Sequence, residues 1–87
     1  MKKKRWVMDY TILYKDGHQD CHHYALDPGP VDHNICAGTI NEALTEAHYR
    51  LFAFVRRSLT AKRYMIWNIG VWEGEAYIEI EEGPDET

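Results

Sequence analysis

The chain has 87 residues, of which 45% are hydrophobic, 28% charged and 13% aromatic. Its length allows one domain with a single core, and its apolar and aromatic content excludes an intrinsically disordered chain. The formal net charge is -4, but four of the ten basic residues lie within residues 2–5, which leaves residues 6–87 with a net charge of -8. We therefore expect most of the surface to repel nucleic acid and to favour a basic partner.

The N-terminal segment does not match a targeting signal. Residues 1–5 are basic, but Asp9 and an alternating pattern follow them in place of a continuous apolar run. No segment approaches the ~18 apolar residues that a membrane span needs. We expect a cytoplasmic protein with one domain over residues 1–87 and no membrane contact. Residues 1–5 would form a flexible basic arm and residues 83–87 a flexible tail.

Alternating apolar and polar side chains predict a first strand over residues 6–15. Its apolar face would carry Trp6, Met8, Tyr10, Ile12 and Tyr14. Asp16-Gly17 predicts a tight type I′ turn, in which glycine tolerates a positive φ, and a return strand over about residues 18–26. Residues 27–38 hold two of the three prolines and are predicted as a loop.

Residues 39–42 match a capping box, in which the Thr39 hydroxyl bonds the Glu42 amide and the Glu42 carboxylate reaches back to the Thr39 amide. A helix is predicted from this box to about residue 61. Its buried stripe would comprise Ile40, Ala43, Leu44, Ala47, Leu51, Phe54, Val55 and Ser58. Basic side chains gather near its end, where cations meet the negative end of the helix dipole: Arg56, Arg57, Lys62 and Arg63.

Two further strands are predicted over residues 64–72 and 75–82, joined at Glu73-Gly74. In the first of them, one face would carry Met65, Trp67, Ile69 and Val71. The order is ββαββ, and the expected fold class is α+β, a four-stranded, mainly antiparallel sheet with one amphipathic helix packed on one face. The opposite sheet face would be solvated and would carry Asp9, Thr11, Glu75, Tyr77, Glu79 and Glu81.

Two surfaces are candidates for binding a partner. The first is the acidic sheet face with its aromatic side chain, through Glu75, Tyr77, Glu79 and Glu81. The second is the helix side outside the buried stripe, through Tyr49, Phe52 and Arg56, because aromatic and arginine side chains are enriched at protein interfaces. We expect a non-enzymatic protein-binding module. Direct binding to nucleic acid is disfavoured, and the sequence is compatible with a homodimer. Its size and acidity resemble phage or mobile-element inhibitors and regulators of basic, nucleic-acid-handling proteins.

Four cysteine and histidine residues make a zinc-stabilised domain an alternative prediction. Cys21 and His23 would share a strand face, and His33 and Cys36 follow in the predicted loop. Two sulfurs and two nitrogens suit a tetrahedral zinc ion, although the C-x-H and H-x-x-C spacings depart from the usual zinc pairs. Without zinc, both cysteines are expected as thiols in a reducing compartment. A weak nucleic-acid binder that uses residues 1–5 and the basic helix end is a further alternative.

Residues 10–51 resemble the N-terminal part of HicB-type antitoxins, through the hairpin, the Pro-Gly loop and the helix opening TINEALTEA. The resemblance implies a ββα unit whose sheet holds a small toxin. The C-terminal DNA-binding element of that family has no counterpart, because residues 64–82 are predicted as strands.

Overall fold

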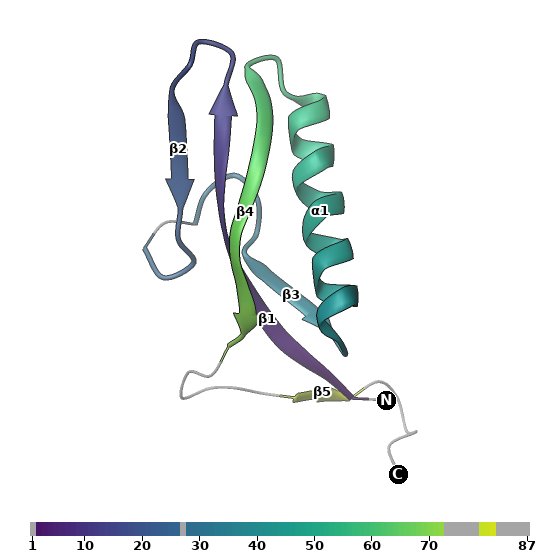
Figure 1. Ribbon diagram of the computed structural model, residues 1–87. Helices are drawn as coiled ribbons and strands as arrows, with labels where there is room; N and C mark the ends of the chain where they lie inside the picture. The colour runs from purple at the N-terminus through teal and green to yellow at the C-terminus, as the bar shows by residue number, and fades with distance from the viewer. Residues whose placement is uncertain (1, 27, 73–78, 82–87) are drawn as a thin grey trace.

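The computed structural model describes residues 2–26, 28–72 and 79–81 (Figure 1). The elements are β1 (Lys2–Tyr14), β2 (Gln19–His22), β3 (Asn34–Ala37), α1 (Ile40–Arg57), β4 (Ala61–Val71) and β5 (Glu79–Glu81). The predicted fold class is confirmed, because β1 to β4 form an antiparallel sheet against which α1 packs. β5 adds a short fifth strand.

β1 is the centre of the sheet, because each of the other described strands pairs with it. Trp6 and Val7 pair with β3 and with β4 at once, so β3 and β4 lie on opposite edges of β1. Residues 10–13 pair with β2 and with β4, which places β2 and β3 one after the other along the same edge. β5 pairs with residues 2–4. One long strand therefore joins both ends of the sheet.

Several predicted strand boundaries are wrong. β1 begins at Lys2, so most of the segment predicted as a flexible arm belongs to the sheet. β3 lies inside the predicted loop 27–38, where Ile35 and Ala37 alternate with exposed neighbours and enter the core. Four residues are too few for a period to stand out beside two prolines. β2 ends at His22, and a turn follows.

The first hairpin closes through a three-residue loop and not through the predicted type I′ turn. The Tyr14 amide donates to the His18 carbonyl at 3.0 Å, and the Gly17 amide donates to the Tyr14 carbonyl at 2.9 Å. Among the described residues only glycines have a positive φ, with 98° at Gly17, so Asp16 lacks the positive φ that a type I′ turn needs. The glycine is still required, one step later in the turn.

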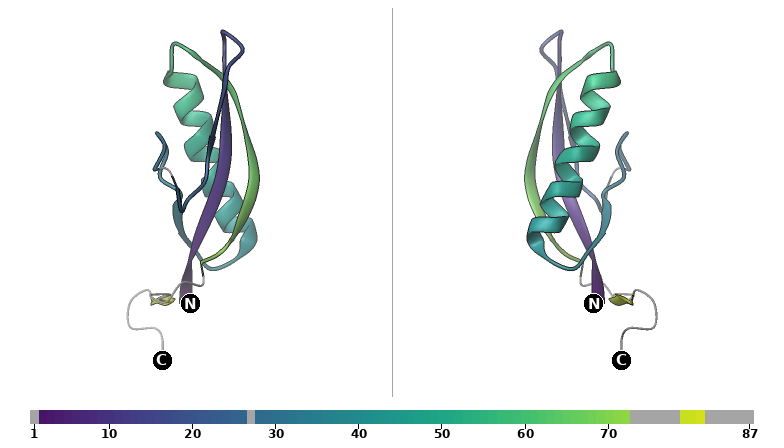
Figure 2. Two further views of the ribbon diagram at one scale, coloured as in Figure 1. Left: turned by 90° about the vertical axis from the view of Figure 1, so that its left-hand side faces the viewer. Right: turned by 90° about the vertical axis from the view of Figure 1, so that its right-hand side faces the viewer.

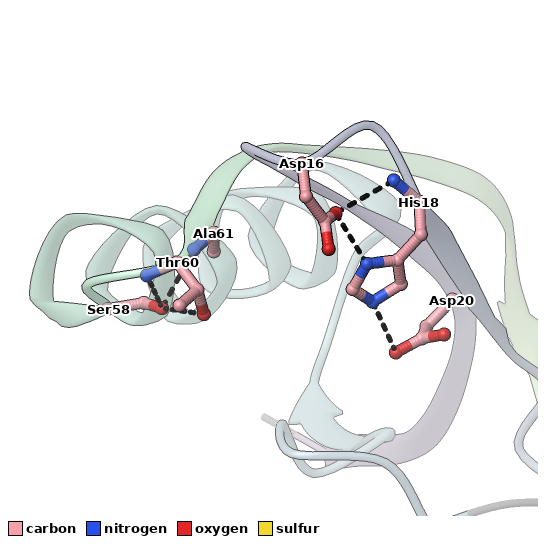
Figure 3. A network of polar contacts seen from close by, with 6 residues as sticks. All are labelled: Asp16, His18, Asp20, Ser58, Thr60 and Ala61. Carbon is pink, nitrogen blue, oxygen red and sulfur yellow. Dashed lines mark hydrogen bonds and ion pairs between the residues drawn. The ribbon is translucent and has the colours of Figure 1, made fainter.

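α1 ends at Arg57, before the predicted end near residue 61. Ser58 has an extended backbone, and its hydroxyl accepts hydrogen bonds from the amides of Thr60 and Ala61 at 3.1 and 2.9 Å (Figure 3). A serine side chain that bonds nearby amides competes with helix formation. The helix therefore ends at Arg57, and β4 begins at Ala61.

At the start of α1, one of the two hydrogen bonds of the predicted capping box is present. The Thr39 hydroxyl accepts the Glu42 amide at 3.2 Å, but the Glu42 carboxylate accepts the amide of Gly38 and not that of Thr39. From the predicted stripe, Ala43, Ala47 and Leu51 are buried, while Ile40 in the first turn is 42% exposed.

The core lies between α1 and one face of the sheet, which Figure 2 shows nearly edge-on. The predicted apolar face of the first strand supplies its centre, with Trp6, Met8, Tyr10 and Ile12 buried and Tyr14 packed at the margin. The even-numbered residues of β1 therefore face the helix, and the odd-numbered residues face away from it.

A β-bulge interrupts the pairing of β4 with β1. Asp9 pairs with Asn68 while Tyr10 pairs with Ile66, so Trp67 is an extra residue without a register partner. A bulge of this kind lets two consecutive side chains point to the same side of a sheet. Asn68 and Trp67 both lie on the side of Asp9, as their contacts with Asp9 and His23 show.

The bulge overturns the predicted faces of this strand. Ile69 and Val71 pack against the core, whereas Met65 pairs with Thr11 and faces away from the helix together with Trp67. The prediction that these four residues share one face is therefore wrong. A register change of one residue moves all following side chains to the opposite face, and no period in the sequence announces it.

Candidate binding face

The sheet face turned away from α1 is called the open face. It carries the odd-numbered residues of β1 and the residues that pair with them, because directly opposed side chains of antiparallel strands share a face. Its members are Arg5, Val7, Asp9, Thr11 and Leu13 of β1, Gln19 and Cys21 of β2, Asn34 and Cys36 of β3, and Arg63, Met65, Asn68 and Gly70 of β4. Trp67 joins them through the bulge.

Asp9 lies at the middle of the open face and is only 1% exposed, in contrast to the predicted solvated position. Its Oδ1 accepts the Tyr24 amide at 2.9 Å, and its Oδ2 accepts Nδ2 of Asn68 at 3.2 Å. The Nε2 atom of His23 lies 3.7 Å from Oδ2. A carboxylate so enclosed needs these donors, because burying it without them would cost several kcal/mol.

Thr11 is buried as well, at 7% exposure, which also corrects its predicted place in solvent. Its hydroxyl donates to the Sγ atom of Cys21 at 3.3 Å. Cys21 itself is exposed, as is Cys36, and both are free thiols as predicted. The open face therefore has a buried polar floor below exposed side chains.

Three aromatic rings lie over Asp9 and form the aromatic cluster: His23, Tyr24 and Trp67. The His23 and Tyr24 rings stack with centroids 4.8 Å apart, and the His23 and Trp67 centroids are 6.4 Å apart. The Nδ1 atom of His23 accepts the Ala25 amide at 3.1 Å, so the neutral ring carries its proton on Nε2, toward Asp9. The hydrogen bond from the Ala25 amide thus orients the ring.

Large side chains of the open face remain in contact with water. Met65 is 61% exposed, Trp67 49% and Tyr24 40%. α1 and the core lie on the opposite face of the sheet and so do not cover them. Sequence reasoning missed this group, because it paired Trp67 with core residues and treated His23 only as a metal ligand. The sequence offered one indication of this group: the predicted strand over residues 64–72 carries large aromatic side chains on both of its faces, whereas one helix can cover only one face.

Arginines lie at the two ends of the open face. The Arg5 guanidinium lies 4.1 Å from the centre of the Trp72 ring, and its Nε donates to Asn34 Oδ1 at 2.8 Å. Arg63 pairs with Leu13 at the other end and is exposed. Between the ends, Gly70 leaves open space where a side chain would stand. Asp9 is the one carboxylate that the paired residues of β1 to β4 place on this face, and the exposed Asp32 carboxylate lies at its Arg5 end, where it accepts Nδ2 of Asn34 at 3.0 Å.

The four residues predicted as zinc ligands are not brought together. Cys21, His23 and Cys36 lie on the open face, but His33 is buried on the side of Tyr10, with its Nδ1 bonded to the Met8 carbonyl at 2.7 Å. Within the described part of the chain, no three His, Cys, Asp or Glu residues are grouped closely enough to hold a metal ion. Zinc binding stays a prediction that the structure does not test.

The residues predicted to bind a partner fall into separate places. Tyr49 and Phe52 are 68% and 55% exposed on α1, and Arg56 is exposed one turn later. Tyr49 lines a hollow of about 260 Å³ between α1 and residues 30–31. Glu79 and Glu81 belong to β5, where they pair with Lys4 and Lys2. Glu75 and Tyr77 lie outside the described residues, so the acidic face stays a prediction.

A further polar network lies at the tip of the first hairpin (Figure 3). The His18 ring lies between two carboxylates, with Nδ1 2.6 Å from Asp16 and Nε2 3.8 Å from Asp20, and it stacks on Tyr14. Hydrogen bonds from the amide and ring of His18 lower the pKa of Asp16. All three polar side chains are about half exposed or more, and the network fixes the turn. Asp16 and His18 also line a hollow of about 300 Å³ at this end of the molecule, together with Tyr14, Lys15, Leu59 and Thr60.

Comparisons of the chain with protein-family models, with curated proteins and with solved structures found no match. The resemblance to HicB-type antitoxins therefore stays a prediction. Within the described residues, no helix has the length and apolar character to cross a bilayer.

Proposed function

We propose that the protein is a non-enzymatic binding module that holds a macromolecular partner against the open face. One observation carries this proposal: Met65, Trp67 and Tyr24 are 40–61% exposed above a buried, hydrogen-bonded Asp9. Tryptophan, tyrosine, methionine and arginine are the residues enriched where proteins bind partners. A solvated sheet face without a binding role would favour small polar or charged side chains.

The rings are held in place before a partner arrives, which favours binding. The His23 ring is oriented by the hydrogen bond from the Ala25 amide and stacks on the Tyr24 ring. Trp67 is placed by the bulge, whose neighbour Asn68 is bonded to Asp9. Side chains that are already ordered lose less conformational entropy on binding.

Site-specific photo-crosslinking in the native host tests this proposal. A photoreactive phenylalanine analogue at Met65 reports on the open face, and the same analogue at Tyr49 reports on the exposed side of α1. Both positions are exposed, so both variants should fold. We expect adducts, to protein or to nucleic acid, from position 65 and few from position 49. Adducts only from position 49, or from neither position, would overturn the proposal.

The helix side is the second candidate surface. Tyr49, Phe52 and Arg56 follow one another at helical spacing, and all three are exposed. An aromatic pair next to an arginine is suited to anchor a partner protein. Photo-crosslinks from position 49 alone would select this surface in place of the open face.

A further inference from the structure

We propose that the partner of the open face is a single-stranded nucleic acid, with its bases stacked on the exposed aromatic rings and its phosphates near Arg5 and Arg63. This inference rests on the proposed binding role of the open face and names the chemical class of the partner.

The charge of the open face is the first argument. Its ends carry the Arg5 and Arg63 guanidinium groups, and Asp9, the carboxylate at its middle, is enclosed. At the Arg5 end the Asp32 carboxylate is already engaged by the amide and side chain of Asn34. In the sequence the acidic residues concentrate at the C-terminal end, because residues 73–87 hold seven acidic and no basic residues. Residues 1–72 hold ten basic and seven acidic residues, a net of +3. The described part of the face therefore suits a polyanion, despite the net charge of the whole chain.

The aromatic side chains are the second argument. Every base has a flat face that can stack on an exposed ring, so a protein can bind a single strand without reading its sequence. Trp67 is half exposed beside the stacked pair of His23 and Tyr24, and Trp72 is partly exposed under the Arg5 guanidinium. The two tryptophans are five positions apart along an extended segment, roughly 16 Å. Gly70 leaves open space between them.

The extent of the face is the third argument. Arg5 and Arg63 are separated by about eight residues along β1, or roughly 26 Å. A strand of several nucleotides can span this length, whereas one small ligand cannot reach both arginines. Double-stranded DNA keeps its bases stacked inside the helix, so the rings favour a single strand over a duplex.

Fluorescence anisotropy with a labelled oligodeoxythymidine of about 12 nucleotides tests the inference on the full chain at low salt. We expect binding that weakens as salt rises and that a duplex of the same length competes for poorly. Replacing Trp67 by Ala should weaken binding roughly 5- to 150-fold, the range for loss of one stacked base. Arg63→Gln should weaken it as well, while Arg57→Gln, an exposed change on α1, should leave it unchanged.

Thiol protection gives a second readout that does not depend on any variant. Cys21 and Cys36 are exposed and both lie on the open face. A bound oligonucleotide should slow their alkylation by N-ethylmaleimide, whereas the duplex should not. Anisotropy that does not change on adding the protein, or binding that Trp67→Ala leaves intact, would overturn the nucleic-acid inference. If position 65 still crosslinks to a protein in that case, the proposed function stands and its partner is a protein.

Discussion

Asn68 donates a hydrogen bond from Nδ2 to Oδ2 of Asp9 at 3.2 Å, across 59 positions of the sequence. The same carboxylate accepts the Tyr24 amide through Oδ1. One buried side chain on β1 therefore joins the bulge of β4 to the turn after β2. Because Trp67 sits in that bulge and His23 precedes that turn, the arrangement of the aromatic cluster depends on Asp9.

Replacing Asp9 by Asn should lower the free energy of unfolding by about 1–3 kcal/mol, because an amide nitrogen cannot accept one of the two hydrogen bonds. Urea denaturation followed by circular dichroism measures the change. Asp20→Asn is the matched control, since Asp20 is about half exposed, and should change stability by less than ~0.5 kcal/mol. Equal stability of the two variants would show that Asp9 does not hold the segments together.

Gly29 and Gly70 should respond in opposite ways to alanine. Gly29 has a φ of 66°, and a Cβ there would collide with the Tyr10 hydroxyl and the His22 ring. We expect Gly29→Ala to destabilise by about 1–3 kcal/mol. At Gly70 a Cβ meets open space inside a strand, so Gly70→Ala should be neutral or stabilising by up to ~1 kcal/mol. Thermal unfolding compares the pair, and a similar loss in both would contradict this account.

The Tyr10 hydroxyl holds residues 28–33 onto the sheet. It donates to the Val31 carbonyl at 2.8 Å and accepts the Val31 amide at 2.9 Å, and all of these atoms are buried. Tyr10→Phe leaves both backbone groups without this partner and should cost about 1–3 kcal/mol. Tyr64→Phe removes a hydroxyl bonded to His48 at an exposed site and should cost less than about 1 kcal/mol. Equilibrium unfolding that ranks the two variants the other way would refute this role.

Stability should fall in acid as Asp32 is protonated. The backbone amide of Asn34 is the main cause of a lowered pKa at Asp32, helped by the Asn34 side chain and by Arg50. A carboxylate with a depressed pKa in the folded state stabilises the fold above its usual pKa of about 3.8, and this contribution disappears as the pH falls through the folded value. Asp32→Asn should therefore reduce the melting temperature at pH 7 but not near pH 2. An equal difference at both pH values would exclude this linkage.

The sequence was sufficient for the parts of the fold that local chemistry controls. The period-two pattern of residues 6–14 placed Trp6, Met8, Tyr10 and Ile12 in the core, and the Thr39 cap fixed where α1 begins. These signals involve neighbours in the chain, so they can be read without knowing the rest of the structure. The α+β class followed, because one amphipathic helix and one apolar sheet face bury each other.

The candidate site was decided by tertiary structure. The bulge at Trp67 exists only relative to the register of β1, and it turns Trp67 and Met65 outward while Ile69 stays inside. Asp9 looks like a solvated strand residue in the sequence, yet donors from Tyr24 and Asn68 make its burial stable. Such pairings join residues far apart in the chain, so the pattern of neighbouring residues in the sequence cannot predict them. Composition and period thus determined the fold class, whereas the long-range register determined which side chains the protein offers to a partner.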